Sequence, residues 1–149
     1  MKICRFTEGN GGAVHWGVIE GGSVRELDKS PFEGAALFEM KKGEPRELGK
    51  VRLLSPVAPS KIVAIGLNYR AHAAEFDKEL PEEPMLFMKP STAVIGPEDF
   101  IIYPSHMSHR VDYEGELAIV IGSKAKDVPA EKAASYILGY TCFNDVTAR

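Results

Sequence analysis

The sequence lacks any long hydrophobic run, since no segment of its 149 residues approaches the roughly 18 consecutive apolar residues of a membrane-spanning helix. The first residues, MKICRF, also lack the apolar stretch of a signal peptide. A basic excess is missing too, because 18 Lys and Arg oppose 21 Asp and Glu, giving a formal net charge of −3. A surface that binds nucleic-acid phosphates needs clustered basic residues. We therefore expect a cytoplasmic protein with neither a membrane nor a nucleic acid as partner.

Cysteine is scarce as well. Cys4 and Cys142 are far apart in sequence and match no metal-binding or redox spacing. We expect them to be buried thiols in a reducing compartment. What the sequence does contain is 44% hydrophobic and 26% charged residues, which is typical of a globular protein with one sizeable core.

Short β-prone runs separated by glycines fill residues 1–27, and this pattern predicts a meander of small hairpins. Ser30 and Pro31 then provide an N-cap and a first-turn proline, so we expect a short helix that ends at Gly43. His15 lies inside a predicted strand, where a lone histidine usually packs, and it receives no site role.

A change of composition marks a domain boundary. Residues 41–50 are rich in charge, Gly and Pro, and in residues 51–59 two prolines flank an apolar pair. We predict a small β-rich N-terminal domain over residues 1–55 and a second domain over residues 56–149.

The second domain is predicted to combine strands with short helices. Residues 61–67 form a nearly unbroken apolar run, which indicates a buried strand, and residues 68–76 are rich in helix formers. The acidic segment 77–84 contains two prolines and predicts a mobile connection, so we expect residues 72–84 to be the least ordered part of this domain. The remaining predicted elements are strands at 85–88, 100–103, 111–122 and 140–149, and a helix that begins near Pro129 and ends at Gly139.

Two carboxylates stand out in the predicted strand 111–122. Glu114 and Glu116 are two residues apart, so their side chains point the same way. The apolar residues 119–121 imply that this strand runs into a core, where two nearby anions would repel. A divalent cation would relieve that repulsion, and a cluster without Cys or His selects Mg²⁺, Mn²⁺ or Ca²⁺ over zinc. The alternative is the solvated face of an antiparallel sheet.

Asp145 supplies a third carboxylate in the last predicted strand, which is otherwise uncharged as far as residue 148. If it meets Glu114 and Glu116, the metal interpretation is favoured, because Mg²⁺ takes few protein carboxylates and completes its octahedron with water or substrate.

A second candidate group lies in the predicted helix 68–76. His72 and Glu75 are three residues apart and share a helix face, so the carboxylate can orient the imidazole and raise its basicity, as a general base for water requires. The alternative is an ordinary surface pair. Lys89, at the end of the next predicted strand, is either a cation for an anionic substrate or a solvated lysine.

Four segments, taken together, resemble the fumarylacetoacetate hydrolase family. They are GLNYRAHAAE at residues 66–75, LFMKPSTAV at residues 86–94, YEGELAIVIG at residues 113–122 and GYTCFNDVTAR at residues 139–149. They occur in the family's order and at similar separations. The resemblance covers roughly residues 58–149.

This resemblance implies a mixed α+β, mainly β fold. The expected architecture is the family's β-roll, incomplete in this chain, preceded by the small β-rich N-terminal domain. Members are usually dimeric, and their motif continues beyond the position of Arg149 into further strands. We therefore expect either a fragment or a fold completed by a second polypeptide, such as the partner in a homodimer.

The resemblance also implies roles for individual residues. Glu114, Glu116 and Asp145 would bind Mg²⁺ or Mn²⁺, and Asp112 would lie outside the ligand set. The catalytic pair would be His72 and Glu75, carried on a helix that orders over bound substrate. Lys89 would lie near the substrate.

The expected activity is hydrolysis of a C–C bond in a 2-oxo or β-diketo acid of the acylpyruvate or fumarylacetoacetate type, through a metal-stabilised enolate. A decarboxylase, or an isomerase of the 2-hydroxyhepta-2,4-diene-1,7-dioate type from aromatic catabolism, would use the same site without an attacking water. The predicted His–Glu pair favours hydrolysis. A non-catalytic fragment or a metal-binding interaction protein is the alternative from another class.

Overall fold

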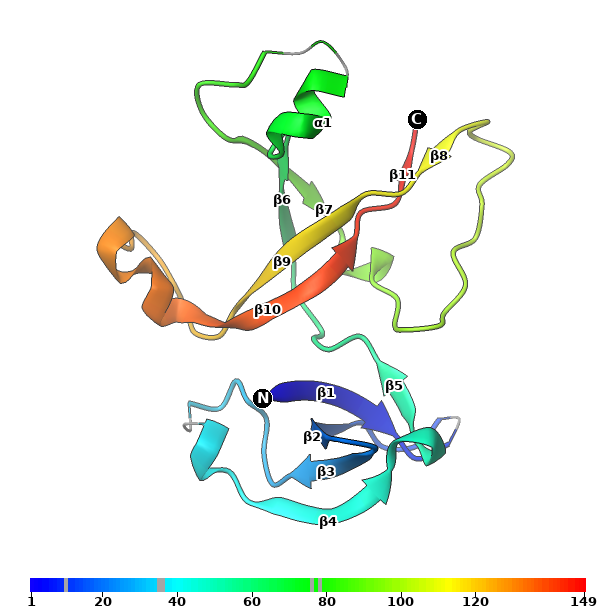
Figure 1. The fold of residues 1–149 in the computed structure, drawn as a ribbon, viewed down its shortest axis with the longest axis vertical. Helices are drawn as coiled ribbons and strands as arrows, with labels where there is room; N and C mark the ends of the chain where they lie inside the picture. The colour runs from blue at the N-terminus through cyan, green and yellow to red at the C-terminus, as the bar shows by residue number, and fades with distance from the viewer. Residues whose placement is uncertain (10, 35–36, 76, 78) are drawn as a thin grey trace. The chain divides into compact units, whose positions relative to one another are not determined.

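The structure is a computed structural model, and it describes residues 1–9, 11–34, 37–75, 77 and 79–149. The chain forms two compact units, Met1–Val57 with Gly96–Arg149, and Ala58–Ile95, and each is described by itself (Figure 1). Strands predominate and the helices are short, so the prediction of a mainly β fold is confirmed. In the described part of the chain, the helices fall short of the length and apolar character needed to cross a membrane.

The N-terminal part of the first unit is a five-stranded antiparallel sheet in the order β4-β3-β2-β1-β5. Its strands are β1 (Lys2–Thr7), β2 (His15–Glu20), β3 (Ser23–Leu27), β4 (Lys42–Glu47) and β5 (Arg52–Leu54), and a 3₁₀ turn η2 (Leu48–Lys50) precedes the last. The predicted meander over residues 1–27 is confirmed. Gly21 in the β2–β3 turn has φ +60°, a conformation that favours glycine in a two-residue hairpin.

This sheet buries residues on both faces. Phe6 and Val24 are fully buried and cluster with Cys4 on one face, while Val18 clusters with Leu27 and Met40. The register pairs Val24 with Ile19, the neighbour of Val18, so the two clusters lie on opposite faces. A small domain therefore gains two apolar layers from one sheet.

One segment and one prediction of the N-terminal part need comment. Residues 42–47, which are rich in charge, form β4, and among the described residues this strand pairs with β3 alone. An edge strand tolerates charges and proline, because one side of it needs no ladder hydrogen bonds. The helix expected over residues 30–43 appears only as a turn and a single 3₁₀ turn, η1 (Leu37–Glu39), in the described residues, and Ala35 and Ala36 lie outside them.

The second unit is built on one hairpin. Strand β6 (Ile62–Gly66) pairs with β7 (Met85–Lys89) along its whole length, and α1 (Arg70–Glu75) follows β6. A 3₁₀ turn, η3 (Ser91–Ala93), comes after β7. The strands predicted over residues 61–67 and 85–88 and the helix predicted within residues 68–76 are confirmed. The prediction that β6 is buried is wrong, because in this strand only Ala64 is buried and Val63 is 55% exposed.

The rest of the first unit is a long, interrupted antiparallel ribbon. It comprises β8 (Val111–Asp112), β9 (Gly115–Ile121), a 3₁₀ helix η4 (Ala130–Tyr136), β10 (Ile137–Asn144) and β11 (Thr147–Ala148). β9 pairs with β10 and β8 with β11, so the two predicted strands 111–122 and 140–149 are each broken in two (Figure 1). Residues 100–103 form no strand, the predicted helix is 3₁₀, and Gly139 lies in β10 rather than at a helix end.

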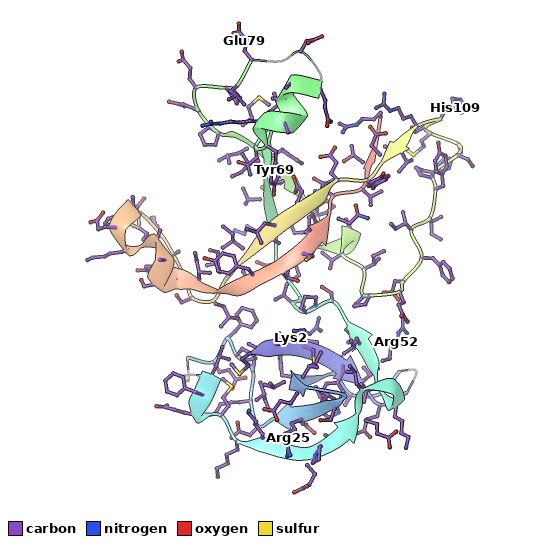
Figure 2. The ribbon with its side chains drawn as sticks, in the orientation of Figure 1. Lys2, Arg25, Arg52, Tyr69, Glu79 and His109 are labelled. Atoms are coloured by element: carbon purple, nitrogen blue, oxygen red, sulfur yellow. The ribbon has the colours of Figure 1, made fainter. Side chains whose placement is uncertain are left out.

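Strand β9 is less buried than the core strand that was predicted. Glu116, Ala118 and Val120 are half-buried, whereas Leu117 and Ile119 are 62% and 53% exposed. Side chains project from both sides of this ribbon (Figure 2). The apolar sequence of β9 therefore gives it a wide apolar face that the described residues of this chain leave open.

Candidate metal centre

The site forms where the ribbon is interrupted. Gly115 pairs with Asn144 at the end of the β9–β10 ladder, and Asp112 pairs with Thr147 at the start of the β8–β11 ladder. Between them the backbone N–H of Asp145 donates to the Glu114 carbonyl at 2.8 Å. The N–H of Glu114 in turn donates to the Asn144 side-chain oxygen at 3.2 Å. These bonds hold Glu114 and Asp145 beside each other outside the regular pleat.

The three predicted carboxylates converge at this interruption. One ligand oxygen each from Glu114, Glu116 and Asp145 lies within 4.8 Å of the other two. Asp145 is buried, with 2% exposure, and both glutamates are half-buried. Sequence reasoning had this juxtaposition right, although it placed Glu114 within one continuous strand and the structure places it between two.

The donor set suits a hard divalent cation. All three donors are carboxylate oxygens, which favour Mg²⁺, Mn²⁺ or Ca²⁺ over softer metals. Oxygens on opposite sides of one ion lie about 4.2 Å apart for Mg²⁺ and about 5 Å apart for Ca²⁺. The limit of 4.8 Å on the spacing of the three oxygens is below the span of Ca²⁺ and above that of Mg²⁺, so a smaller ion would draw the carboxylates closer together. A cation would also offset the cost of burying Asp145 among other anions.

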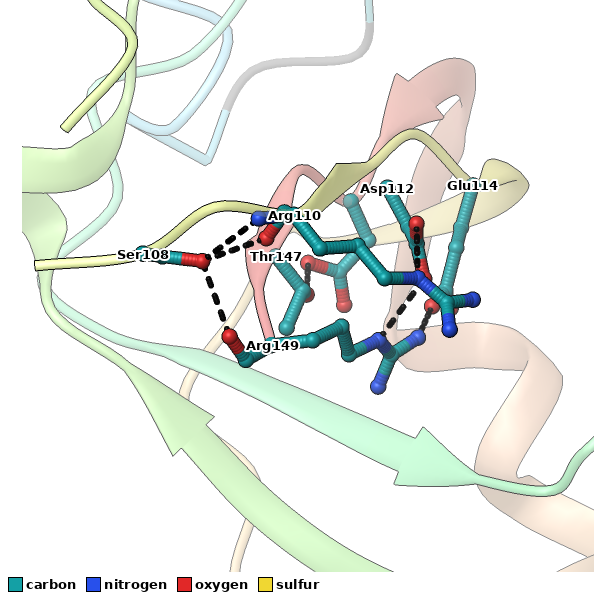
Figure 3. A network of polar contacts seen from close by, with 7 residues as sticks. Ser108, Arg110, Asp112, Glu114, Thr147 and Arg149 are labelled. Carbon is teal, nitrogen blue, oxygen red and sulfur yellow. Dashed lines mark hydrogen bonds and ion pairs between the residues drawn. The ribbon is translucent and has the colours of Figure 1, made fainter. Parts of the chain in front are cut away.

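Two arginines flank the acidic cluster (Figure 3). The Nε of Arg149 lies 3.0 Å from Oδ2 of Asp112, and its guanidinium also contacts Oε1 of Glu114. The Nε of Arg110 lies 3.0 Å from the other oxygen of Asp112. Hydrogen bonds from Arg110 first and Arg149 second hold the pKa of Asp112 below its ordinary value. Asp112 therefore binds both arginines, and Arg149 links it to Glu114 of the carboxylate cluster.

Ser108 ties the backbone of this network together. Its buried hydroxyl lies 2.6 Å from the carbonyl of Arg110 and 2.8 Å from that of Arg149, and it accepts from the Arg110 N–H at 3.0 Å. A hydroxyl has one hydrogen, so it donates to one of these carbonyls at a time. The N–H of Arg149 also donates to the Arg110 carbonyl at 2.9 Å.

Sequence reasoning missed these three residues. It named Asp112 as lying outside the ligand set, and it gave no role to Ser108, Arg110 or Arg149. The available signal was Asp112 itself, an acid in alternation with Glu114 and Glu116.

The other predicted site residues belong to the second unit. His72 and Glu75 lie in α1, three residues apart as predicted, and the side chain of His72 is outside the described structure. Lys89 is half-buried at the end of β7, with its Nζ 6.0 Å from the centre of the Phe87 ring. The lid predicted over residues 72–84 stays a prediction, and Phe76 and Lys78 within it are outside the described residues.

The prediction of two buried thiols is right for one cysteine and wrong for the other. Cys4 is buried, whereas Cys142 is exposed on β10, and both are free. Burial raises the pKa of the Cys4 thiol to about 11.

Comparison with known proteins identifies the class that this fold and this carboxylate cluster represent. The family of the fumarylacetoacetate (FAA) hydrolase C-terminal domain matches residues 61–149, which is more than half of the chain. An Rv2993c-like N-terminal domain matches residues 1–56. The chain belongs to the fumarylacetoacetate hydrolase family.

Individual relatives agree with this membership. An uncharacterized protein of Archaeoglobus fulgidus is 65% identical over 102 residues, which cover 68% of this chain and 40% of the relative. A crystal structure of 5-carboxymethyl-2-hydroxymuconate delta-isomerase from Mycobacterium smegmatis is 42% identical, with a TM-score of 0.83, and the match covers 100% of this chain and 56% of that one. A structure of maleylpyruvate hydrolase from Sphingobium sp. SYK-6, in complex with manganese(II) and pyruvate, is 29% identical, with a TM-score of 0.71, over 100% of this chain and 60% of that one. This chain thus spans 40 to 60% of the length of these three proteins.

Proposed function

We propose that this chain forms part of a divalent-metal-dependent hydrolase that cleaves a C–C bond in a 2-oxo or β-diketo acid of the acylpyruvate or fumarylacetoacetate type. The observation that carries the proposal is the convergence of Glu114, Glu116 and Asp145 in a member of this family. The maleylpyruvate hydrolase similar to this chain was solved with manganese(II) and pyruvate, a 2-oxo acid. The proposed location is the cytoplasm.

In this proposal the three carboxylates hold Mg²⁺, or Mn²⁺ in its place. An ion bound there supplies Lewis-acid polarisation of a substrate carbonyl oxygen. Asp145 anchors the set because it is buried and its backbone N–H is bonded to the Glu114 carbonyl. Its side chain also accepts from the Thr147 hydroxyl at 3.4 Å, which restrains the carboxylate.

The proposed proton chemistry belongs to α1. The imidazole of His72 accepts a proton from the attacking water, and Glu75, one helical turn away, orients the ring and stabilises its protonated form. The ammonium group of Lys89 binds a carboxylate of the substrate. The proposed partners are this small 2-oxo or dicarboxylate substrate and a further polypeptide, either a second copy in a homodimer or additional chain.

The second candidate is an isomerase or decarboxylase of 2-oxo acids or 2-hydroxy-dienedioates in aromatic catabolism. The 42% identity to a 5-carboxymethyl-2-hydroxymuconate delta-isomerase favours it. Both candidates use the carboxylate cluster and a carbonyl-activating ion. They differ in the need for a water nucleophile, and therefore in their dependence on His72.

Product analysis of the purified chain tests these proposals. Acylpyruvates, oxaloacetate and a 2-hydroxy-dienedioate are incubated with Mg²⁺ or Mn²⁺, and products are identified by chromatography and mass spectrometry. Hydrolysis requires release of a carboxylic acid with incorporation of ¹⁸O from labelled water, whereas isomerisation conserves mass and decarboxylation releases CO₂. Turnover that is unaffected by EDTA would refute metal dependence. A chain that binds the ion but converts none of these substrates would support the interaction-protein alternative.

A further inference from the structure

Arg149 and Arg110 offer a natural comparison. Both guanidinium groups bind Asp112, with their Nε atoms 3.0 Å from its two different oxygens. Arg149 also contacts Oε1 of Glu114, whereas the described structure gives Arg110 an ion pair with Asp112 only. The two residues therefore carry the same charge beside the same acid, and they differ in contact with a proposed metal ligand (Figure 3).

We propose that Arg149, held by Asp112, is a positioning residue that orients the Glu114 carboxylate for the metal ion. This inference rests on the proposed function of the three-carboxylate cluster. A guanidinium is a rigid planar fork with several donors, so one Arg149 can bind Asp112 through Nε and Glu114 through a terminal nitrogen at once. Because Arg149 binds Oε1 of Glu114, it restrains the orientation of this carboxylate, whose second oxygen would be available to the ion.

Glu114 needs such support more than the other two carboxylates. Glu116 lies within β9 and its direction is set by the strand pleat, and Asp145 is buried. Glu114 lies between β8 and β9, and its side chain is 23% exposed. A long side chain in that position loses rotational freedom only through contacts of its own, and the structure supplies Arg149 as that contact.

Arg149 is itself held in place. Its backbone carbonyl meets the Ser108 hydroxyl at 2.8 Å, and its N–H binds the Arg110 carbonyl at 2.9 Å. Its Nε is bonded to Asp112, which is paired with Thr147 across the β8–β11 ladder. The backbone and the side chain of Arg149 are both restrained, so its guanidinium group can hold the Glu114 carboxylate in one orientation.

Positioning and simple charge predict opposite results. If the arginines act only as positive charges near a cation site, removing either one should strengthen metal binding by a similar factor. If Arg149 positions Glu114, removing it should weaken binding, and removing Arg110 should not. Arg149→Lys separates the two effects further, because lysine keeps the charge and loses the planar fork.

The experiment measures Mn²⁺ affinity of the full chain by isothermal titration calorimetry, with electron paramagnetic resonance of free Mn²⁺ as a second readout. The variants are Arg149→Met, Arg149→Lys, Asp112→Asn and, as the matched control, Arg110→Met. Circular dichroism and urea unfolding check that each variant is folded. We expect Kd to rise about 10- to 100-fold in Arg149→Met and about 10-fold in Arg149→Lys, as for other groups that orient metal ligands.

The controls make the outcomes distinguishable. Arg110→Met should stay within about threefold of wild type, because its exposed charge is screened and no ligand contact is lost. Asp112→Asn should weaken binding less than Arg149→Met does, because Arg149 keeps its contact with Glu114. Equal affinities in Arg149→Met and Arg110→Met, or tighter binding in Arg149→Met, would overturn the inference. If Arg149→Met does not fold, Arg149→Lys against Arg110→Met decides it. Absence of saturable Mn²⁺ binding by the wild type would instead refute the proposed metal site.

Discussion

Replacing Glu116 with glutamine is the most direct test of the carboxylate cluster. Glu116→Gln keeps the size of the side chain and removes one of three charges whose oxygens lie within 4.8 Å of one another. At that separation two unit charges repel by about 1 kcal/mol in bulk water and about 3 kcal/mol at an effective dielectric constant near 20. Two of the three repelling pairs disappear, so the metal-free variant should be at least as stable as the wild type.

The effect of metal should be the opposite. An ion that binds only the folded state stabilises it by RT ln(1 + [L]/Kd), or about 2.7 kcal/mol at a metal concentration of 100 Kd. The wild type should gain this increment with Mg²⁺ or Mn²⁺, and Glu116→Gln should gain little because one of three ligands is lost. Urea unfolding followed by circular dichroism, with EDTA and with saturating metal, gives both quantities.

Glu131→Gln is the matched control. Glu131 is an exposed carboxylate in η4, outside the convergent cluster. Its substitution should leave the response to metal unchanged. If Glu116→Gln is more than about 1 kcal/mol less stable than the wild type in EDTA, beyond the usual range for a surface substitution, the carboxylate is structural and the reasoning fails.

Three further predictions concern the core, the thiols and assembly. Gly17→Ala should cost about 1–3 kcal/mol in unfolding free energy, measured by urea denaturation, because its Cβ would lie 2.7 Å from a methyl group of Val24; an unchanged midpoint would contradict this. In the folded chain at pH 8, one thiol should react with Ellman's reagent, Cys142, and the second only after unfolding. Burial raises the Cys4 pKa to about 11, above the value near 8.5 of an unfolded thiol. The contribution of Cys4 to the free energy of unfolding should therefore be constant below about pH 8.5 and decrease as the pH rises from about 8.5 to 11. Light scattering should give a mass above the 16.3 kDa of one chain, and Leu117→Glu should shift it toward a monomer; a well-behaved wild-type monomer would refute self-association.

Much of the fold could be predicted from local patterns. The hairpins of residues 1–27 follow from β-prone runs between glycines, and β6, α1 and β7 follow from their apolar and helix-forming segments. Pairing partners decide the elements that local patterns do not predict. β4 has the composition of a loop and becomes a strand because β3 offers it an edge. Residues 100–103 have the composition of a strand, and in the described part of the chain they pair with no other strand.

The candidate site could be predicted from the sequence only where the chain keeps the regular side-chain alternation of a strand. Phe143 pairs with Glu116 across the ladder, so these two side chains share a face, and Asp145 follows Phe143 by two residues, just beyond the end of β10. Glu114 meets them although it lies outside both strands, since backbone hydrogen bonds to the 144–145 segment hold it there. Glu114 therefore lies in the cluster as predicted, but these backbone hydrogen bonds place it there and not the alternation of side chains along a strand.

The arginine network could not be read from the sequence, because it depends on register. Arg149 approaches Asp112 only since Thr147 pairs with Asp112 and the ribbon continues past the interruption at residues 113–114 and 145–146. A slip of two residues would keep every side chain on its face, but it would move Arg149 by about 7 Å along the strand and out of reach of Glu114. The two-residue β8–β11 ladder, with Ser108 closing its end, thus determines whether the guanidinium meets a metal ligand. Deleting Val146, or inserting one residue after it, should weaken Mn²⁺ binding measured by calorimetry even though all three carboxylates remain, and an unchanged Kd would contradict this reasoning.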